Sequence, residues 1–96
     1  MIKKYSQIVK LNPERSHSIL REFTKVLSSG YVYLEPGKEC GIHSTKHYEE
    51  LLIFLQGEGT LQFENDKINI KENHVVYIPP YTTHNVIAGE KPLKYI

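Results

Sequence analysis

Three histidines and a glutamate in two stretches of this chain carry side chains that could bind a metal ion. His43, His47 and Glu50 lie close together in the first stretch, and His84 follows the consecutive prolines Pro79-Pro80 in the second. Imidazole nitrogens and carboxylate oxygens are common ligands of divalent transition metals in proteins. The two stretches are far apart in the sequence, so the fold must bring them together.

The residues around these side chains are typical of a β-protein. Tyrosine, isoleucine and valine are frequent, and glycine, proline and asparagine interrupt them at short intervals, which favours strands separated by turns. We therefore expect strands at residues 31–34, 41–45, 50–56, 74–78, 84–87 and 93–96. Strands at this spacing predict an antiparallel sandwich or small barrel. Residues 15–27 could form either a short helix or an irregular lead-in strand, because Ile19, Leu20 and Phe23 have helical spacing.

A β-hairpin is expected around Asn65-Asp66. Leu61 and Phe63 alternate with polar residues before this pair, and the alternation resumes after it with Ile68 and Ile70. Asn and Asp tolerate the positive φ that tight turns require. With these two residues at the turn, Phe63 faces Ile68. Leu61 then faces Ile70, and all four side chains share one face of the hairpin.

Side-chain alternation also places the candidate ligands. Successive side chains of a strand point to opposite sides, so His43 and Thr45 share a face. A turn over residues 46–49 would let Glu50, at the start of the next strand, point into the same cavity as His43. His47 keeps the parity of His43 and Thr45, although it could lie past the end of the strand, in the turn.

The spacing in the first stretch resembles the first motif of the cupin family. That motif has a Pro-Gly pair, five residues, His-x-His, three or four residues, a Glu, six residues and a Gly. In this chain the corresponding positions are Pro36-Gly37, His43, Thr45 in place of the second His, Glu50 and Gly57.

The second stretch resembles the second cupin motif. The match begins at Asn73, which stands in place of a Gly, and continues through Pro79-Pro80-Tyr81 to His84, with Ala88 in place of an Asn. Tyr81 also replaces a Gly, which suggests a different turn after the prolines. The two motifs cover residues 36–57 and 73–88, and a match to both spacings is far more specific than a match to one.

This resemblance implies a single cupin domain over residues 1–96, built as an antiparallel double-stranded β-helix, or jelly-roll barrel. It also implies a divalent metal ion (iron, manganese, nickel or zinc) bound in the barrel by His43, Glu50 and His84. Because Thr45 replaces a usual ligand, His47 is the natural substitute. The residues expected to line the pocket around the ion are Thr45, Tyr48, Phe54 and Tyr81.

Three classes of function fit such a site. The first is a metal-dependent enzyme, such as an oxygenase or an isomerase, that acts on a small polar metabolite. The second is a non-catalytic module that binds or senses a small ligand or a metal. The third is a metal-free cupin of the sugar isomerase or epimerase type, in which a histidine acts as the general base. One fold hosts many chemistries, so the resemblance does not choose among them.

Composition restricts the partners of the protein. Twelve basic and eleven acidic residues give a formal charge of +1, so no basic face for nucleic acid is expected. A single cysteine, Cys40, excludes an intrachain disulfide, and no signal peptide or membrane span is expected, so we expect a cytoplasmic protein. The strand over residues 50–56 is apolar on both faces and needs two covers, which predicts a homodimer.

Overall fold

The computed structural model describes residues 10–21 and 24–96, and this part of the chain forms nine β-strands and no helix. The strands are β1 (His17–Leu20), β2 (Ser29–Leu34), β3 (His43–Ser44), β4 (Glu50–Gln56), β5 (Glu58–Phe63), β6 (Lys67–Lys71), β7 (Val75–Ile78), β8 (Thr83–Ala88) and β9 (Leu93–Tyr95). Within these described ranges, no helix is long and apolar enough to cross a membrane. The all-β antiparallel fold expected from the sequence is confirmed.

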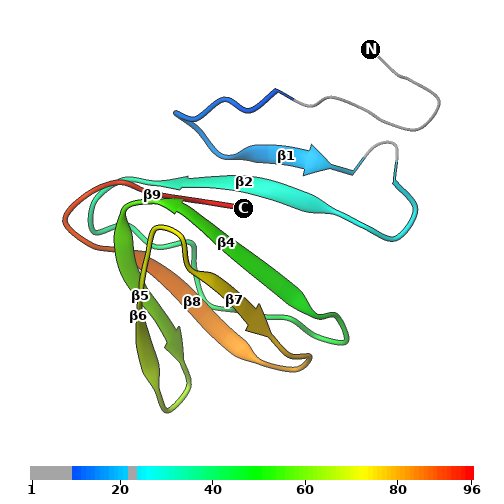
Figure 1. Ribbon diagram of the computed structural model, residues 1–96. Coiled ribbons are helices and arrows are strands. Elements are labelled where there is room, and N and C mark those ends of the chain that lie inside the picture. The colour runs from blue at the N-terminus through cyan, green and yellow to red at the C-terminus, as the bar shows by residue number, and fades with distance from the viewer. Residues whose placement is uncertain (1–9, 22–23) are drawn as a thin grey trace.

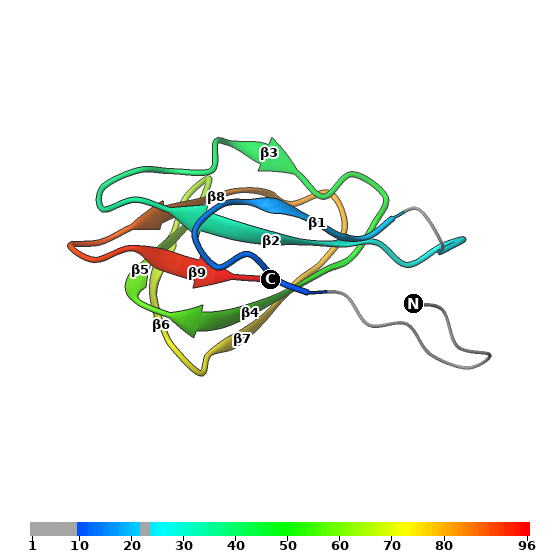
Figure 2. The same cartoon turned by 90° about the horizontal axis from the view of Figure 1, so that it is seen from above.

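The strands form two antiparallel sheets packed against each other (Figures 1 and 2). One sheet has five strands in the order β1-β2-β9-β4-β7, and the other has four in the order β3-β8-β5-β6. The two strands of the first motif region, β3 and β4, therefore belong to different sheets.

Alternation along the strands places the core between the sheets. On β4, Leu52 and Phe54 are buried, whereas Leu51, Ile53 and Leu55 face outwards. The buried cluster draws side chains from both sheets: Leu34, Leu52, Phe54, Leu61, Ile70, Ile78, Val86, Ala88, Leu93 and Tyr95. Burial of this apolar surface is what holds the two layers together.

Residues 15–27 were expected to form either a short helix or an irregular strand. Within this range the structure contains the strand β1. β1 pairs with β2, with His17 opposite Tyr31, and the Tyr31 hydroxyl donates to the carbonyl of Pro13 at 2.8 Å. Pairing with a sheet edge satisfies the backbone of this segment and overrides its helical spacing. Of the two alternatives, the described residues form the lead-in strand and not the helix; residues 22–23 lie outside them.

The strand expected at residues 41–45 is shorter than predicted. β3 contains only His43 and Ser44. Gly41 has a φ of 104°, and its N–H donates to the side-chain oxygen of Asn85 at 3.0 Å. This left-handed backbone diverts the chain before β3 begins.

The hairpin of β5 and β6 is confirmed, but its predicted register is wrong. Leu61 lies opposite Ile68, and Gly59 lies opposite Ile70. The turn lies one residue earlier than expected, because the N–H of Phe63 donates to the carbonyl of Asp66 at 2.7 Å and only Glu64 and Asn65 lie between them. The register is shifted by two residues, which keeps each side chain on its predicted face.

Candidate metal centre

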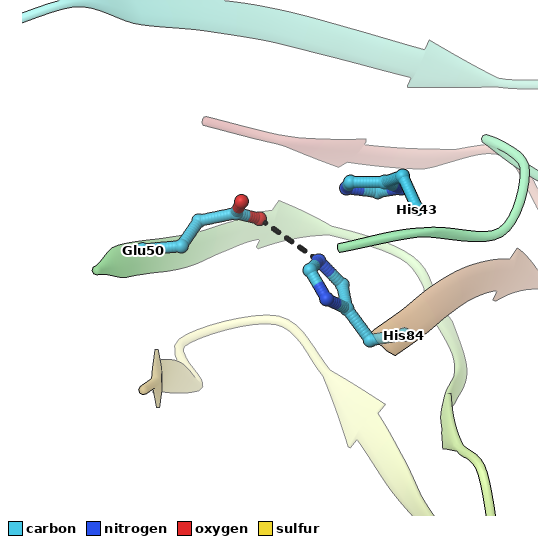
Figure 3. A group of neighbouring side chains, drawn as sticks. All are labelled: His43, Glu50 and His84. Atoms are coloured by element: carbon cyan, nitrogen blue, oxygen red, sulfur yellow. Dashed lines mark hydrogen bonds and ion pairs between the residues drawn. The ribbon is translucent and has the colours of Figure 1, made fainter. Parts of the chain in front are cut away.

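His43 and His84 are cross-strand neighbours. They are direct partners in the pairing of β3 with β8, so their side chains lie on the same face of the four-stranded sheet. Their ring centroids are 4.2 Å apart, with an angle of 60° between the ring planes. Glu50, the first residue of β4, approaches from the five-stranded sheet, and Figure 3 shows the three side chains meeting between the layers.

The three side chains are close enough to share one ion. Each offers a ligand atom that lies within 4.8 Å of the other two. The distance from His84 Nε2 to Glu50 Oε1 is 3.2 Å (Figure 3). Two ligands about 2.1 Å from one ion and at right angles to each other are about 3 Å apart, so this spacing suits a transition metal.

Backbone carbonyls fix the orientation of both imidazoles. His43 Nδ1 lies 2.9 Å from the carbonyl oxygen of Gly41, and His84 Nδ1 lies 3.0 Å from that of Thr82. A carbonyl oxygen can only accept, so Nδ1 carries the proton in both rings and the Nε2 lone pair remains available to a metal. This is the outer support that metal-binding histidines commonly have.

The environment of His84 favours a cation between its ring and Glu50. His84 is 1% exposed, and with Nδ1 donating to Thr82 its Nε2 faces a carboxylate oxygen. Two acceptors face each other at this point unless the ring takes a second proton or a cation lies between them. The donor set of two imidazoles and one carboxylate therefore fits a divalent metal ion.

Thr45 connects the two segments that carry these residues. Its hydroxyl donates to the carbonyl of Pro79 at 2.8 Å and accepts from the N–H of Thr82 at 3.0 Å. The backbone of the next residue also takes part, since the N–H of Tyr81 donates to the carbonyl of Lys46 at 2.6 Å. Thr45 is buried, so its hydroxyl is committed to holding the turn before β8 against the loop after β3.

Comparison with known proteins places this fold and site in a family. Residues 30–96 match the family model described as Cupin domain. The chain belongs to the cupin family. The double-stranded β-helix expected from its two motifs is thereby confirmed. The candidate metal group, which consists of His43, Glu50 and His84 and is called the metal group below, lies at the two motif histidines and the motif glutamate.

Solved structures similar to this cupin share its fold at low sequence identity. A cupin protein from Bacteroides fragilis has a TM-score of 0.83 at 18% identity, covering 98% of this chain and 81% of the other. A Cupin 2 conserved barrel domain protein from Salinispora arenicola has a TM-score of 0.73 at 18% identity, with coverages of 99% and 86%. A predicted oxalate decarboxylase from Thermotoga maritima has a TM-score of 0.65 at 24% identity, with coverages of 69% and 58%. These similarities show the fold alone.

One curated relative of this cupin is an uncharacterized protein from Methanocaldococcus jannaschii. The two are 39% identical over 54 residues. The match covers 53% of this chain and 43% of the relative, so the chain spans less than half of that protein's length.

Two positions that are glycines in the cupin motifs are occupied by other residues in this chain, and both keep a left-handed backbone. Asn73 and Tyr81 have φ values of 70° and 55°. The sequence suggested a different turn at Tyr81, but replacement of a glycine by this residue leaves the backbone in the left-handed region. Tyr81 is 78% exposed, so its ring avoids a clash by pointing into solvent.

Of the two adjacent glutamates in this cupin, Glu50 faces the histidines. Glu49 instead accepts a hydrogen bond from the Tyr77 hydroxyl at 2.9 Å, and this bond is the main cause of the raised pKa of Tyr77.

His47 is outside the group formed by His43, Glu50 and His84, and its ring lies 4.1 Å from the ring of Tyr48. Its role as a further ligand stays a prediction.

A pocket of about 920 Å³ opens beside the metal group of this cupin. His43, Glu50, Thr45 and Tyr48 are among its lining residues. Phe54 and Tyr81, which were also expected to line the pocket, are not among these lining residues. Phe54 is buried in the core against the ring of Tyr95, with ring centroids 5.1 Å apart, and Tyr81 projects from the turn before β8.

Tyr95 and Cys40 line the same pocket and were not singled out as site residues by the sequence. Tyr95 shares the inner face of β9 with Leu93, so alternation along this strand could have indicated its direction. Burial raises the pKa of the Tyr95 hydroxyl, and the neighbouring Cys40 thiol and Glu50 carboxylate raise it further. The phenol therefore stays neutral and able to donate a hydrogen bond.

Proposed function

We propose that this cupin binds a divalent transition metal ion through His43, Glu50 and His84 and uses it to bind a small molecule in the adjacent pocket. The observation that carries the proposal is the convergence of two oriented imidazoles and a carboxylate, each with a ligand atom within 4.8 Å of the other two. Iron, manganese, nickel and zinc all accept such a donor set.

The residues of the chain have separable roles in this proposal. Gly41 and Thr82 hold the imidazoles through their carbonyl groups, and Glu50 supplies a negative charge opposite them. An ion with two imidazole ligands and one carboxylate ligand keeps open positions, through which it can polarise an oxygen atom of a bound molecule. Because His43 and Glu50 line the pocket, a molecule in the pocket can reach the ion.

Metal analysis of the protein purified without a histidine tag tests the proposal. We expect about one metal ion per chain in the parent protein and loss of that ion in His43→Ala, Glu50→Gln and His84→Ala. His74→Ala is the matched control, because His74 lies outside the group and its Nδ1 accepts from the N–H of Lys71. A parent protein that binds no divalent metal would overturn the proposal. The metal content of His47→Ala distinguishes two ligand sets. Retention of the ion indicates a three-residue set, and weaker or lost binding indicates that His47 is a fourth ligand.

The same metal centre could serve an enzyme, such as an oxygenase or isomerase, or a non-catalytic sensor. Oxygen consumption and product analysis with small carboxylic acids, compared between the parent and His84→Ala, distinguish the two. Turnover that depends on His84 supports the enzyme. Metal-dependent binding without turnover supports the sensor. A metal-free epimerase-like function would instead leave activity intact after removal of metal by a chelator.

We also propose that the protein forms a homodimer through the outer face of β4 and β7. Leu51 lies opposite Tyr77 and Ile53 lies opposite Val75 in the register of these strands. All four side chains are exposed. They form an apolar patch on β4 and the edge strand β7, and such patches commonly mark protein interfaces. A cytoplasmic location stays a prediction.

A further inference from the structure

The pocket beside the metal group has a polar end and an apolar body. His43 and Glu50 provide the polar end, and Val32, Leu52 and Val86 line the body. Leu52 and Val86 are buried, and Val32 packs against the core cluster. A ligand that fills this pocket therefore needs an apolar portion as well as a group that binds the metal.

The short length of β9 leaves the beginnings of its two neighbouring strands free to line the pocket. This short strand pairs with Val32 to Leu34 of β2 and with Phe54 to Gln56 of β4. Residues at the beginning of both neighbouring strands, Ser29 and Gly30 of β2 and Glu50 to Leu52 of β4, line the pocket beyond this pairing. The space reaches the metal group from the side of the five-stranded sheet.

Tyr95 offers a second polar contact within the pocket. The residue is 4% exposed, and its neighbours include the Cys40 thiol and the Glu50 carboxylate. A thiol is a weak hydrogen-bond acceptor, so a ligand oxygen would be a better partner for the phenol. Tyr95 and Glu50 line the same pocket, so the phenol can serve a ligand group that is bound near the ion.

Charge at the polar end favours an anionic group. A divalent ion leaves a net positive charge after neutralisation by Glu50, because both imidazoles are neutral when they act as ligands. At the pocket rim, Lys46 and Glu49 oppose each other in charge. A carboxylate group matches the remaining positive charge.

We propose, on the basis of the metal-binding function proposed above, that the ligand is a small carboxylic acid with an apolar tail. Its carboxylate binds at the ion and accepts a hydrogen bond from Tyr95, and its tail packs against Val32, Leu52 and Val86. Tyr95 and Val32 are the specificity-determining residues for the head and the tail, respectively. This ligand class differs from the small polar metabolite expected from the sequence, because it combines one polar group with an apolar tail.

Titration of the Co²⁺-loaded protein with straight-chain 2-hydroxy acids, from lactate to 2-hydroxyhexanoate, tests the proposal. The visible spectrum of Co²⁺ reports ligand binding without requiring turnover. In the parent protein we expect affinity to rise roughly threefold to fourfold for each added methylene group, as burial of that group in an apolar pocket predicts.

Two variants separate the head from the tail. Tyr95→Phe removes only the hydroxyl, and we expect it to weaken every acid by about threefold to tenfold while the dependence on chain length is retained. Val32→Thr changes the wall with little change in shape, and we expect it to weaken 2-hydroxyhexanoate several-fold while lactate is unaffected.

Each failure has a distinct meaning. A protein that binds no Co²⁺ overturns the proposed function and this inference with it. A protein that binds Co²⁺ but no 2-hydroxy acid, or binds all of them equally, overturns the inference alone. The chain-length series uses the parent protein, so the test does not depend on the folding of either variant.

Discussion

The hydroxyl of Thr45 donates a hydrogen bond to the carbonyl oxygen of Pro79, 34 positions later in the chain, at 2.8 Å. The same hydroxyl accepts from the N–H of Thr82, whose carbonyl in turn orients His84. Where the cupin motif has a second histidine, this chain has a residue that positions a ligand instead of providing one. The threonine therefore removes a usual ligand from this position of the motif, while the turn that carries His84 stays in place.

Thr45→Val should destabilise the fold. The variant keeps the shape of the side chain but leaves the N–H of Thr82 and the carbonyl of Pro79 without a partner in a buried environment, which typically costs about 1–3 kcal/mol. Urea denaturation measures the change in the free energy of unfolding. Thr83→Val at an exposed position of β8 is the control, and an equal loss in both variants would contradict the bridging role of Thr45.

Tyr81→Gly should stabilise the protein. Tyr81 has a φ of 55°, and a left-handed backbone costs a non-glycine residue about 1–2 kcal/mol. Glycine loses more backbone entropy on folding, so the net gain in unfolding free energy should be a few tenths to about 1 kcal/mol. Tyr48→Gly, at an exposed tyrosine with negative φ, should be neutral or destabilising. A fall in the thermal midpoint of Tyr81→Gly would show that its exposed ring makes a stabilising contact.

Stability should fall in alkaline solution because of Tyr95. Its folded-state pKa is raised above the ordinary value of 10.0, chiefly by burial, so the folded protein keeps a proton that the unfolded chain releases. The contribution is complete below pH 10 and decreases above it, by up to about 1.4 kcal/mol per pH unit. Denaturation curves between about pH 9 and 11 should show a shallower decline for Tyr95→Phe than for the parent. Parallel declines would place the relevant proton on another group.

Leu51→Lys should convert the proposed dimer to a monomer. Leu51 faces outwards on β4 opposite Tyr77, so a lysine there can reach solvent in the monomer but would be buried at the interface. Light scattering coupled to size-exclusion chromatography measures the mass. Ile42→Lys changes another exposed apolar residue, which directly precedes β3 of the other sheet, and should leave the dimer intact. A parent protein that is already monomeric refutes the interface.

The sequence predicted the strands well where alternation and turn residues agree. The bounds of β4 were predicted correctly, because Gly57 ends a continuous apolar run. The register of the β5–β6 hairpin was wrong because shifting a pair by two residues keeps every side chain on its face. Alternation cannot detect such a shift, which depends here on the Asp66 side chain accepting from the N–H of Lys67 and on the residues at which the turn forms.

The candidate site was predictable to a different extent at each position. Motif spacing identified His43, Glu50 and His84 because these residues sit at fixed positions relative to the turns. The bridging role of Thr45 depends on a contact between segments distant in the sequence, which no local pattern reports. Alternation on β9 indicates that Tyr95 faces inwards, but it does not indicate that Tyr95 lies in the same pocket as the metal group. Phe54 shares the face of Glu50 on β4 and packs in the buried core cluster. Parity alone predicted that it lines the pocket, because parity does not report how far along the strand a side chain lies from the pocket.

The three side chains of the metal group do not belong to one layer. His43 and His84 are on the four-stranded sheet, and Glu50 is on the five-stranded sheet. An ion held by all three would act as a cross-link that closes one end of the sandwich, in a domain small enough to have a limited core. Metal loading would then raise the unfolding midpoint in proportion to the logarithm of free metal concentration, so the supply of metal would control how long the protein persists as well as what it binds.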